Sequence, residues 1–123
     1  MTEPSIALGR SIAKWLSDAK VHNPSYVSPD GTAVRVYADM GGTIFLRPDG
    51  TLVGEKESGE PMPVDDNWRT VALVVGARTH PELRELLPVR PGDAVPCNAC
   101  AGTGLIHSVT CGACLGLGWK PAA

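Results

Sequence analysis

The spacing of apolar residues near the N-terminus predicts an amphipathic helix over residues 3–20. Apolar side chains recur there at helical intervals on one stripe, with charged residues elsewhere on the helix. The stripe consists of Leu8, Ile12, Trp15, Leu16 and Ala19. Thr2 is the expected N-cap, and Asn23 followed by Pro24 is expected to end the helix. We expect the stripe to pack on a sheet rather than a membrane, because it is short and the polar face is mixed.

The next part of the chain alternates short β-branched or aromatic runs with turn residues, which predicts a small antiparallel meander. The turn sequence SPDGT at 28–32 recurs as RPDGT at 47–51, and Pro-Asp-Gly favours a turn that closes a hairpin. A further turn is expected at Met40, Gly41 and Gly42. The predicted strands lie near residues 25–28, 33–38, 43–47 and 51–55. We interpret the repeated turn as scaffolding.

A polar segment and a second helix follow. Residues 54–63 contain almost no apolar side chains and predict a solvated loop. Asp65 and Asp66 then favour a helix start over 66–78, because carboxylates cap free N–H groups and suit the positive end of a helix. The inward side chains of this helix would be Trp68, Val71, Ala72 and Val75. The run VALVV is equally compatible with a buried strand, and periodicity leaves both alternatives open.

The remaining segments complete the predicted architecture. A short helix is expected over 80–87 with Thr79 as its N-cap, and PVRPGDAVP at 88–96 predicts a stiff linker. The apolar side of the short helix consists of Leu83, Leu86 and Leu87. The sequence therefore predicts an α+β fold in three parts. They are a body at 1–87 with an N-terminal helix, a meander and two short helices, the linker, and a zinc-clipped hairpin module at 97–119.

All the cysteines of the chain lie in this C-terminal module, in the pattern C-x2-C-x10-C-x2-C. They are Cys97, Cys100, Cys111 and Cys114. Two residues between paired cysteines let one tight turn direct both sulfurs at a single ion, and two such turns complete a tetrahedral shell. Glycines follow both pairs at the same offsets, where they permit unusual backbone angles and a close approach of the turns. This pattern predicts one structural Zn²⁺ with no coordination position left for a reacting water.

Both copies of the motif, CNACAGTG and CGACLGLG, resemble the C-x2-C-x-G-x-G repeat of the DnaJ-type cysteine-rich zinc domain. In that family four copies form two zinc centres, so the pair at 97–118 resembles half of such a domain with one zinc. The resemblance implies that the four cysteines are the zinc ligands and that the region contacts polypeptides. It does not extend to the J-domain, because the tripeptide His80, Pro81 and Glu82 lacks the aspartate of the His-Pro-Asp turn.

The charge of the chain, and of the cysteine module in particular, limits the kinds of molecule that the protein is expected to bind. The chain has 11 basic and 13 acidic residues, and Lys120 is the one permanently cationic side chain from Cys97 onward. Since four thiolates outweigh the charge of one Zn²⁺, the module is anionic and does not suit nucleic acid, whose phosphates need several Lys or Arg contacts. No apolar run reaches the length of a membrane span. The absence of a signal-peptide pattern, together with paired cysteines suited to metal, predicts a cytoplasmic protein.

Candidate catalytic residues are missing from the pattern, so we expect no enzyme activity. Neither a nucleophile with a base nor a pair of carboxylates suited to catalysis stands out, and the acidic residues are explained by a helix start and a solvated loop. His107 is expected to be a loop residue of the cysteine spacer, and His22 and His80 are expected to have surface or core roles.

The apolar residues of the module point to protein binding. So small a unit cannot bury them all, which predicts a contact surface for another protein or for the body. The candidate contact residues are Leu105, Ile106, Leu117 and Trp119. The sequence therefore favours a zinc-binding protein-interaction protein with an adaptor, regulatory or chaperone-like role. Two alternatives stay open: a redox-responsive zinc/thiol protein, and a small domain in which the zinc is purely structural.

Overall fold

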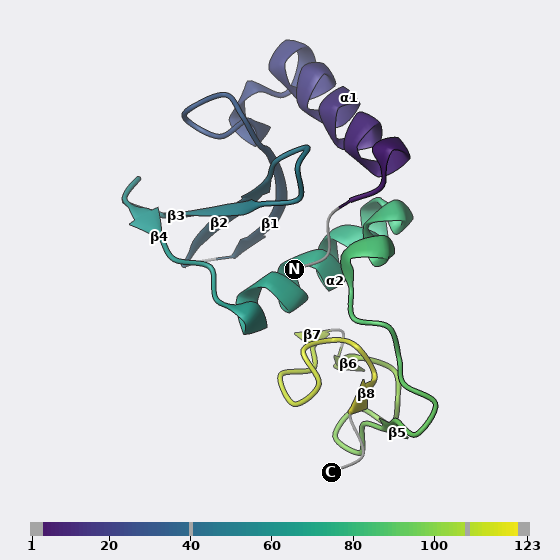
Figure 1. Cartoon of the computed structure of the whole chain (residues 1–123). Helices are drawn as coiled ribbons and strands as arrows, with labels where there is room; N and C mark the ends of the chain where they lie inside the picture. Colours follow the sequence, from purple (N-terminus) through teal and green to yellow (C-terminus); the bar gives the residue numbers. More distant parts are fainter. Residues whose placement is uncertain (1–3, 40, 108, 121–123) are drawn as a thin grey trace.

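The protein is described by a computed structural model that covers residues 4–39, 41–107 and 109–120. Two α-helices and a four-stranded antiparallel sheet make up its larger part, and the cysteine module lies beyond the second helix (Figure 1). The α+β class predicted from the sequence is therefore confirmed. Among the described residues, no helix is both long enough and apolar enough to cross a bilayer.

The first helix, α1, spans Ile6–His22. Its N-cap is Ser5, whose hydroxyl oxygen accepts a hydrogen bond from the Leu8 N–H at 3.1 Å. The N–H and hydroxyl of Ser5 both donate to the Glu85 carboxylate, and these hydrogen bonds hold the pKa of Glu85 below its usual value. The predicted cap, Thr2, lies outside the described residues. The predicted stripe is buried at Leu8, Ile12, Leu16 and Ala19 and partly buried at Trp15.

The sheet has the strand order β1-β2-β3-β4, with every neighbouring pair antiparallel. Its strands are β1 (Val34–Asp39), β2 (Gly42–Leu46), β3 (Leu52–Lys56) and β4 (Pro61–Met62). The predicted turn between β1 and β2 includes Met40, which lies outside the described residues, but Asp39 pairs with Gly42 as a hairpin requires. The meander is thus confirmed for three of the predicted strands.

Two predictions around the sheet are wrong. The segment expected as a strand at 25–28 instead begins with a 3-10 turn, η1 (Pro24–Tyr26), because a proline favours the first position of a helical turn. Only Val27 pairs there, through an isolated bridge to Val34. The segment expected as a loop at 54–63 starts as the end of β3 and returns as β4, so it forms a hairpin.

The repeated turns have the same internal hydrogen bonds. Asp30 and Asp49 each accept hydrogen bonds from the N–H and the hydroxyl of the threonine two residues later. A hydrogen bond from the Ser28 hydroxyl and those from the threonine hold the pKa of Asp30 well below its usual range. Because these carboxylates are used to close their own turns, the scaffolding interpretation accounts for the repeat.

The second helix, α2, spans Asp66–Thr79, so the segment is a helix and not a strand. Asp65 is its N-cap and accepts a hydrogen bond from the Trp68 N–H at 2.8 Å. Its predicted inward face is partly wrong, because Trp68 is 41% exposed. The residues it buries are Ala72, Leu73, Val74, Gly76 and Ala77. This helix is covered on two sides: Leu73 and Ala77 join the body core, whereas Val74 lies against the cysteine module.

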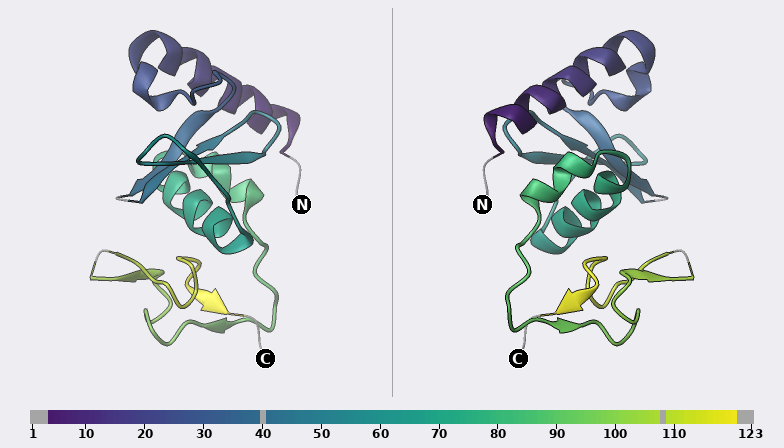
Figure 2. Two further views of the ribbon diagram at one scale, coloured as in Figure 1. Left: turned by 90° about the vertical axis from the view of Figure 1, so that its left-hand side faces the viewer. Right: turned by 90° about the vertical axis from the view of Figure 1, so that its right-hand side faces the viewer.

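A 3-10 helix, η2 (Pro81–Leu86), replaces the helix predicted at 80–87. Thr79 is not its cap, because α2 continues through Thr79 and His80 separates the two helices. The leucines behave as predicted: Leu83 and Leu86 are buried and Leu87 is partly buried. The body core is formed where α1, the sheet, α2 and η2 meet, and the chain then runs along one side of the molecule to the module (Figure 2).

Candidate metal centre

The cysteine module consists of two turns that repeat each other 14 residues apart. In both turns the carbonyl of the first cysteine accepts a hydrogen bond from a glycine N–H five residues later, at 3.0 Å. In both turns the sulfur of the second cysteine accepts a hydrogen bond from a glycine N–H four residues later, at 3.2 Å. The pairs are Gly102 with Cys97, Gly116 with Cys111, Gly104 with Cys100, and Gly118 with Cys114. The duplicated sequence therefore has a duplicated local structure.

The two turns are also joined to each other by reciprocal hydrogen bonds. The Cys97 N–H donates to the Gly118 carbonyl at 3.0 Å, and the Cys111 N–H donates to the Gly104 carbonyl at 2.9 Å. Two short strand pairs frame the turns. They are β5 (Val95–Pro96) with β8 (Trp119–Lys120), and β6 (Leu105–Ile106) with β7 (Val109–Thr110). This two-fold arrangement places the two cysteine pairs face to face.

Glycine is required at the points where the turns meet. Gly104 and Gly118 have φ angles of 80° and 85°, in the left-handed region. A Cβ on Gly118 would lie 2.6 Å from the carbonyl oxygen of Gly102, and one on Gly104 would clash with the carbonyl oxygen of Gly116. Because backbone atoms cannot rotate aside, a larger residue would separate the turns. The prediction that these glycines provide unusual angles and close approach is confirmed.

The four cysteine sulfurs form one cluster, in which all lie within 4.8 Å of one another. The Sγ atoms of Cys97 and Cys111 are 3.9 Å apart, and those of Cys100 and Cys114 are 3.7 Å apart. A tetrahedral ion with bonds of about 2.3 Å to sulfur holds its ligands about 3.8 Å apart. All four cysteines are unpaired and buried. The arrangement fits a four-cysteine metal site.

The thiols of this cluster differ in how readily they ionise. Burial is the largest influence on Cys100 and Cys114, and it opposes ionisation of both. At Cys100 the Gly104 N–H and the neighbouring cysteines outweigh burial and lower the pKa to about 7. At Cys114 burial prevails and raises the pKa to about 11. Since four adjacent thiolates repel one another unless a cation lies between them, metal binding here must release protons.

The module lies against the side of α2 that faces away from the sheet (Figure 2). Arg78 donates a hydrogen bond from Nη2 to the Thr110 hydroxyl at 3.4 Å. A Cβ on Gly116 would lie 2.7 Å from Cγ1 of Val74, so the glycine leaves room for the valine. Val74 and Arg78 are one helical turn apart and share a face of α2. The cysteine module is therefore held beside the body by a narrow strip of this helix, formed by Val74 and Arg78.

The contact between this strip of α2 and the cysteine module can be tested with Val74→Asp. The substitution places a carboxylate at a position where Val74 is only 8% exposed. We expect the contact with the module to weaken by about 1–3 kcal/mol, because the apolar contact with Gly116 is lost and the carboxylate must give up water against the module. Limited proteolysis within 88–96 should become faster while metal content stays the same. Val21→Asp, on α1 at a position that is 74% exposed and outside the cleaved segment, is the control. Equal cleavage of both variants would show that Val74 does not hold the module in place.

The candidate contact residues divide into two groups. Leu105 and Ile106 are 38% and 39% exposed on β6, whereas Leu117 and Trp119 are half-buried. Sequence reasoning missed Val109, which is 67% exposed on β7 and pairs with Ile106. Its signal was a β-branched apolar residue three positions after Ile106, which is the spacing of a paired residue across a tight hairpin. Leu105, Ile106 and Val109 are the large exposed apolar residues of this short hairpin, and Ile106 and Val109 are directly opposed; we call the three residues the hairpin patch.

The histidines lie away from the sulfurs. Among the described residues, no histidine belongs to the cysteine cluster, and His107 is an exposed turn residue with a φ of 50°. His80 stacks on Trp15 with the ring centroids 3.9 Å apart, so it has a packing role. His22 is exposed at the end of α1.

No protein-family model, curated protein or solved structure matches the chain. The likeness to the DnaJ-type repeat therefore consists of the motif at 97–118, and the geometry of the four cysteines is that of a group that could hold a metal ion.

Proposed function

We propose that the chain is a non-enzymatic protein-interaction protein whose cysteine module is ordered by one structural Zn²⁺. The observation that carries the proposal is the set of four buried sulfurs at tetrahedral separations. Tetrahedral sulfur sites suit zinc or iron–sulfur centres, and the DnaJ-type motif favours zinc. Four thiolates saturate Zn²⁺ and leave no position for a substrate or water, which supports a structural role.

The composition of the module explains why it needs a metal. Its buried cluster consists of the cysteines themselves, so little apolar surface is removed from water when the turns form. Zinc binding contributes about 10–16 kcal/mol of apparent free energy to comparable small units. Elemental analysis of protein purified without added metal should find one zinc per chain. Iron in its place would change the assignment of the metal, and a folded, metal-free module would refute the proposal.

The surface that such a module presents to a partner is the hairpin patch. Leu105, Ile106 and Val109 are exposed on two short paired strands, with Ile106 directly opposite Val109, and apolar side chains exposed side by side mark contact surfaces. We propose that Leu117 and Trp119 contribute less to partner binding, because their side chains are half-buried. The partner is a protein segment with apolar side chains, in keeping with the polypeptide binding of the DnaJ-type zinc region.

The cellular location that we propose and the charge of the module are both consistent with a zinc-containing protein that binds other proteins. Thiols that hold a metal require a reducing environment, so we propose a cytoplasmic location. Within residues 97–107 and 109–120, Lys120 is the only Lys or Arg, which does not favour nucleic acid as the partner. A redox-responsive role requires an accessible thiolate, and the cysteines are at most 6% exposed.

Ile106→Asp tests the hairpin patch. We expect binding of an unfolded probe protein, such as reduced and carboxymethylated lactalbumin, to weaken by about tenfold, which corresponds to about 1.4 kcal/mol. Zinc content and thermal stability should stay unchanged because Ile106 is exposed. Val89→Asp removes an exposed apolar residue of the linker and is the control. Equal binding by both variants, or no binding by the unmodified chain, would leave the zinc with a purely structural role.

A further inference from the structure

The free edge of β1 borders a cavity that is separate from the metal centre. β1 is the first strand in the sheet order, so β2 pairs with only one of its edges. Beyond the bridge from Val34 to Val27, no strand in the described ranges pairs with the other edge. A cavity of about 520 Å³ is lined by all of residues 34–38. Since successive strand residues point to opposite faces of a sheet, a cavity that reaches all of them follows the edge.

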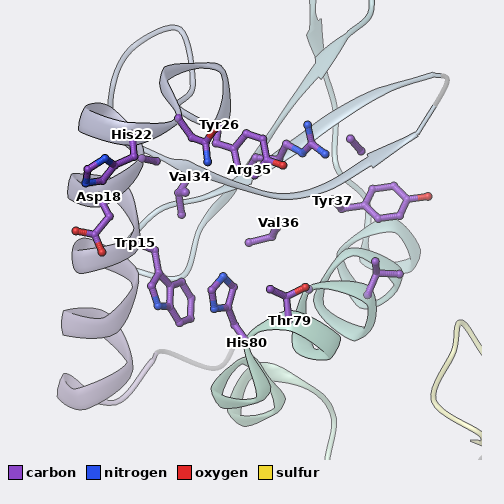
Figure 3. Close-up of a pocket in the computed structure, with 15 residues that line it drawn as sticks. Trp15, Asp18, His22, Tyr26, Val34, Arg35, Val36, Tyr37, Thr79 and His80 are labelled. Atoms are coloured by element: carbon purple, nitrogen blue, oxygen red, sulfur yellow. The ribbon is translucent and has the colours of Figure 1, made fainter.

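Two helices form the walls of this groove, as Figure 3 shows. The C-terminal half of α1 contributes Trp15, Asp18 and His22, and the C-terminal end of α2 leads into His80. Trp15 and His80 stack with an interplanar angle of 20°, below the strand in this view. Their rings offer an aromatic surface to an apolar side chain that enters from the open side.

The opposite face of β1 presents a cation. The Arg35 guanidinium lies over the Tyr26 ring, 4.4 Å from its centroid, and both side chains lie above the strand in Figure 3. Arg35 is exposed, and within the described part of the chain the ion pair found is that of Arg47 with Asp30. Arg35 is therefore available to a carboxylate from a bound molecule.

The two edges of the sheet differ in how they are protected. Sheet edges are usually blocked by short length, proline, lysine or a bulge, because their free N–H and carbonyl groups pair with other chains. β4 is two residues long and starts with Pro61. β1 is six residues long, VRVYAD, and contains neither proline nor lysine. Its protections are the charged side chains of Arg35 and Asp39 and a bulge between Arg35 and Tyr37, and bulges also occur where side chains are redirected at binding sites.

We propose that this groove binds an extended segment of a partner protein, which adds to the sheet as a strand beside β1. Main-chain hydrogen bonds from the free edge would hold the segment, and its side chains would supply specificity. An apolar side chain would lie on Trp15 and His80, and a carboxylate would face Arg35 on the other side of the strand. Neighbouring residues of a strand point to opposite faces. The recognised pattern is therefore an apolar residue directly followed or preceded by an acidic one.

The segment can be found with a phage-displayed library of random peptides, selected against the whole zinc-loaded chain. We expect the enriched peptides to share an adjacent apolar and acidic pair. One enriched peptide is then synthesised with a fluorescent label. In an anisotropy titration it should bind the Arg35→Glu variant at least tenfold more weakly than the unmodified chain. Arg10→Glu makes the same charge change at an exposed position of α1 that does not line the groove, and it should bind normally. Failure to enrich such a pair, or equal binding by both variants, overturns the proposal.

Strand addition is tested through the peptide backbone. N-methylation at alternate peptide residues removes the N–H groups that face β1, and we expect it to abolish binding. Methylation of the intervening residues should have little effect. On binding, the amide protons of β1 should exchange more slowly with solvent. If methylation at both sets of positions has the same effect, the peptide does not add as a strand. The proposal is also overturned if a second copy of the chain occupies the groove and prevents the peptide from binding. Each of these outcomes leaves the zinc content and the hairpin patch untouched.

Discussion

Replacing Cys111 with serine should remove the metal and unfold residues 97–119 while the body stays folded. Cys111 is fully buried, and its sulfur lies 3.9 Å from that of Cys97. Serine does not provide a thiolate, so the tetrahedral shell loses one of its four ligands. The two turns have no other buried apolar cluster in the described structure, and about 10 kcal/mol or more of metal-binding free energy is lost with the shell.

Elemental analysis should then show a fall from one zinc per chain to nearly none. In amide NMR spectra the signals of the module should collapse to random-coil positions, whereas those of α1 and the sheet should persist. Ala113→Ser is the matched control, because it adds a hydroxyl at an exposed position of the same turn without removing a ligand. Full zinc content in Cys111→Ser would mean that this cysteine is not a ligand.

The body is expected to survive because its core contains no residue of the module. The core joins α1, the sheet, α2 and η2, and α2 contributes Leu73 and Ala77 to it from the side away from the cysteines. Loss of the module would expose Val74, which costs at most about 3 kcal/mol. Disappearance of the body's thermal transition in Cys111→Ser would show that the two parts fold as one unit.

The cysteine cluster could be predicted from the sequence because the residues that form each half of it are close together in the chain. Each pair of cysteines lies within one turn, and the glycines that donate to the sulfurs are four residues further on. The Pro-Asp-Gly turns of the meander are local in the same way, since Asp30 and Asp49 bond to the threonines beside them. In both cases a short stretch of chain contains the donors, the acceptors and the backbone flexibility that its structure requires.

Features that depend on distant neighbours could not be predicted. The buried face of α2 was partly misassigned because the helix is covered by the body on one side and by the module on the other, and one-sided periodicity does not describe such a helix. The groove beside β1 combines Trp15, Arg35 and His80 from three separate elements. The stack of His80 on Trp15 arises only when the C-terminal end of α2 comes together with the middle of α1.

Gly104→Ala should weaken metal binding although it changes no ligand. Gly104 has a φ of 80°, and the added Cβ would clash with the Gly116 carbonyl of the other turn. A left-handed alanine costs about 1–2 kcal/mol, and the clash adds to it, so we expect the zinc affinity to fall at least about tenfold, the equivalent of about 1.4 kcal/mol. Competition with a chromogenic chelator measures this affinity.

Gly112→Ala is the control for this comparison, because a Cβ at Gly112 meets nothing within 4 Å and the residue does not have a positive φ. Both variants keep the same thiolates and the same charge. Alanine at position 104 also keeps the N–H that donates to the Cys100 sulfur, so a difference between the variants measures the close approach of the two turns. Equal affinities would mean that the turns can separate without loss of the metal, and that the repeated glycines do not fix the distance between the cysteine pairs.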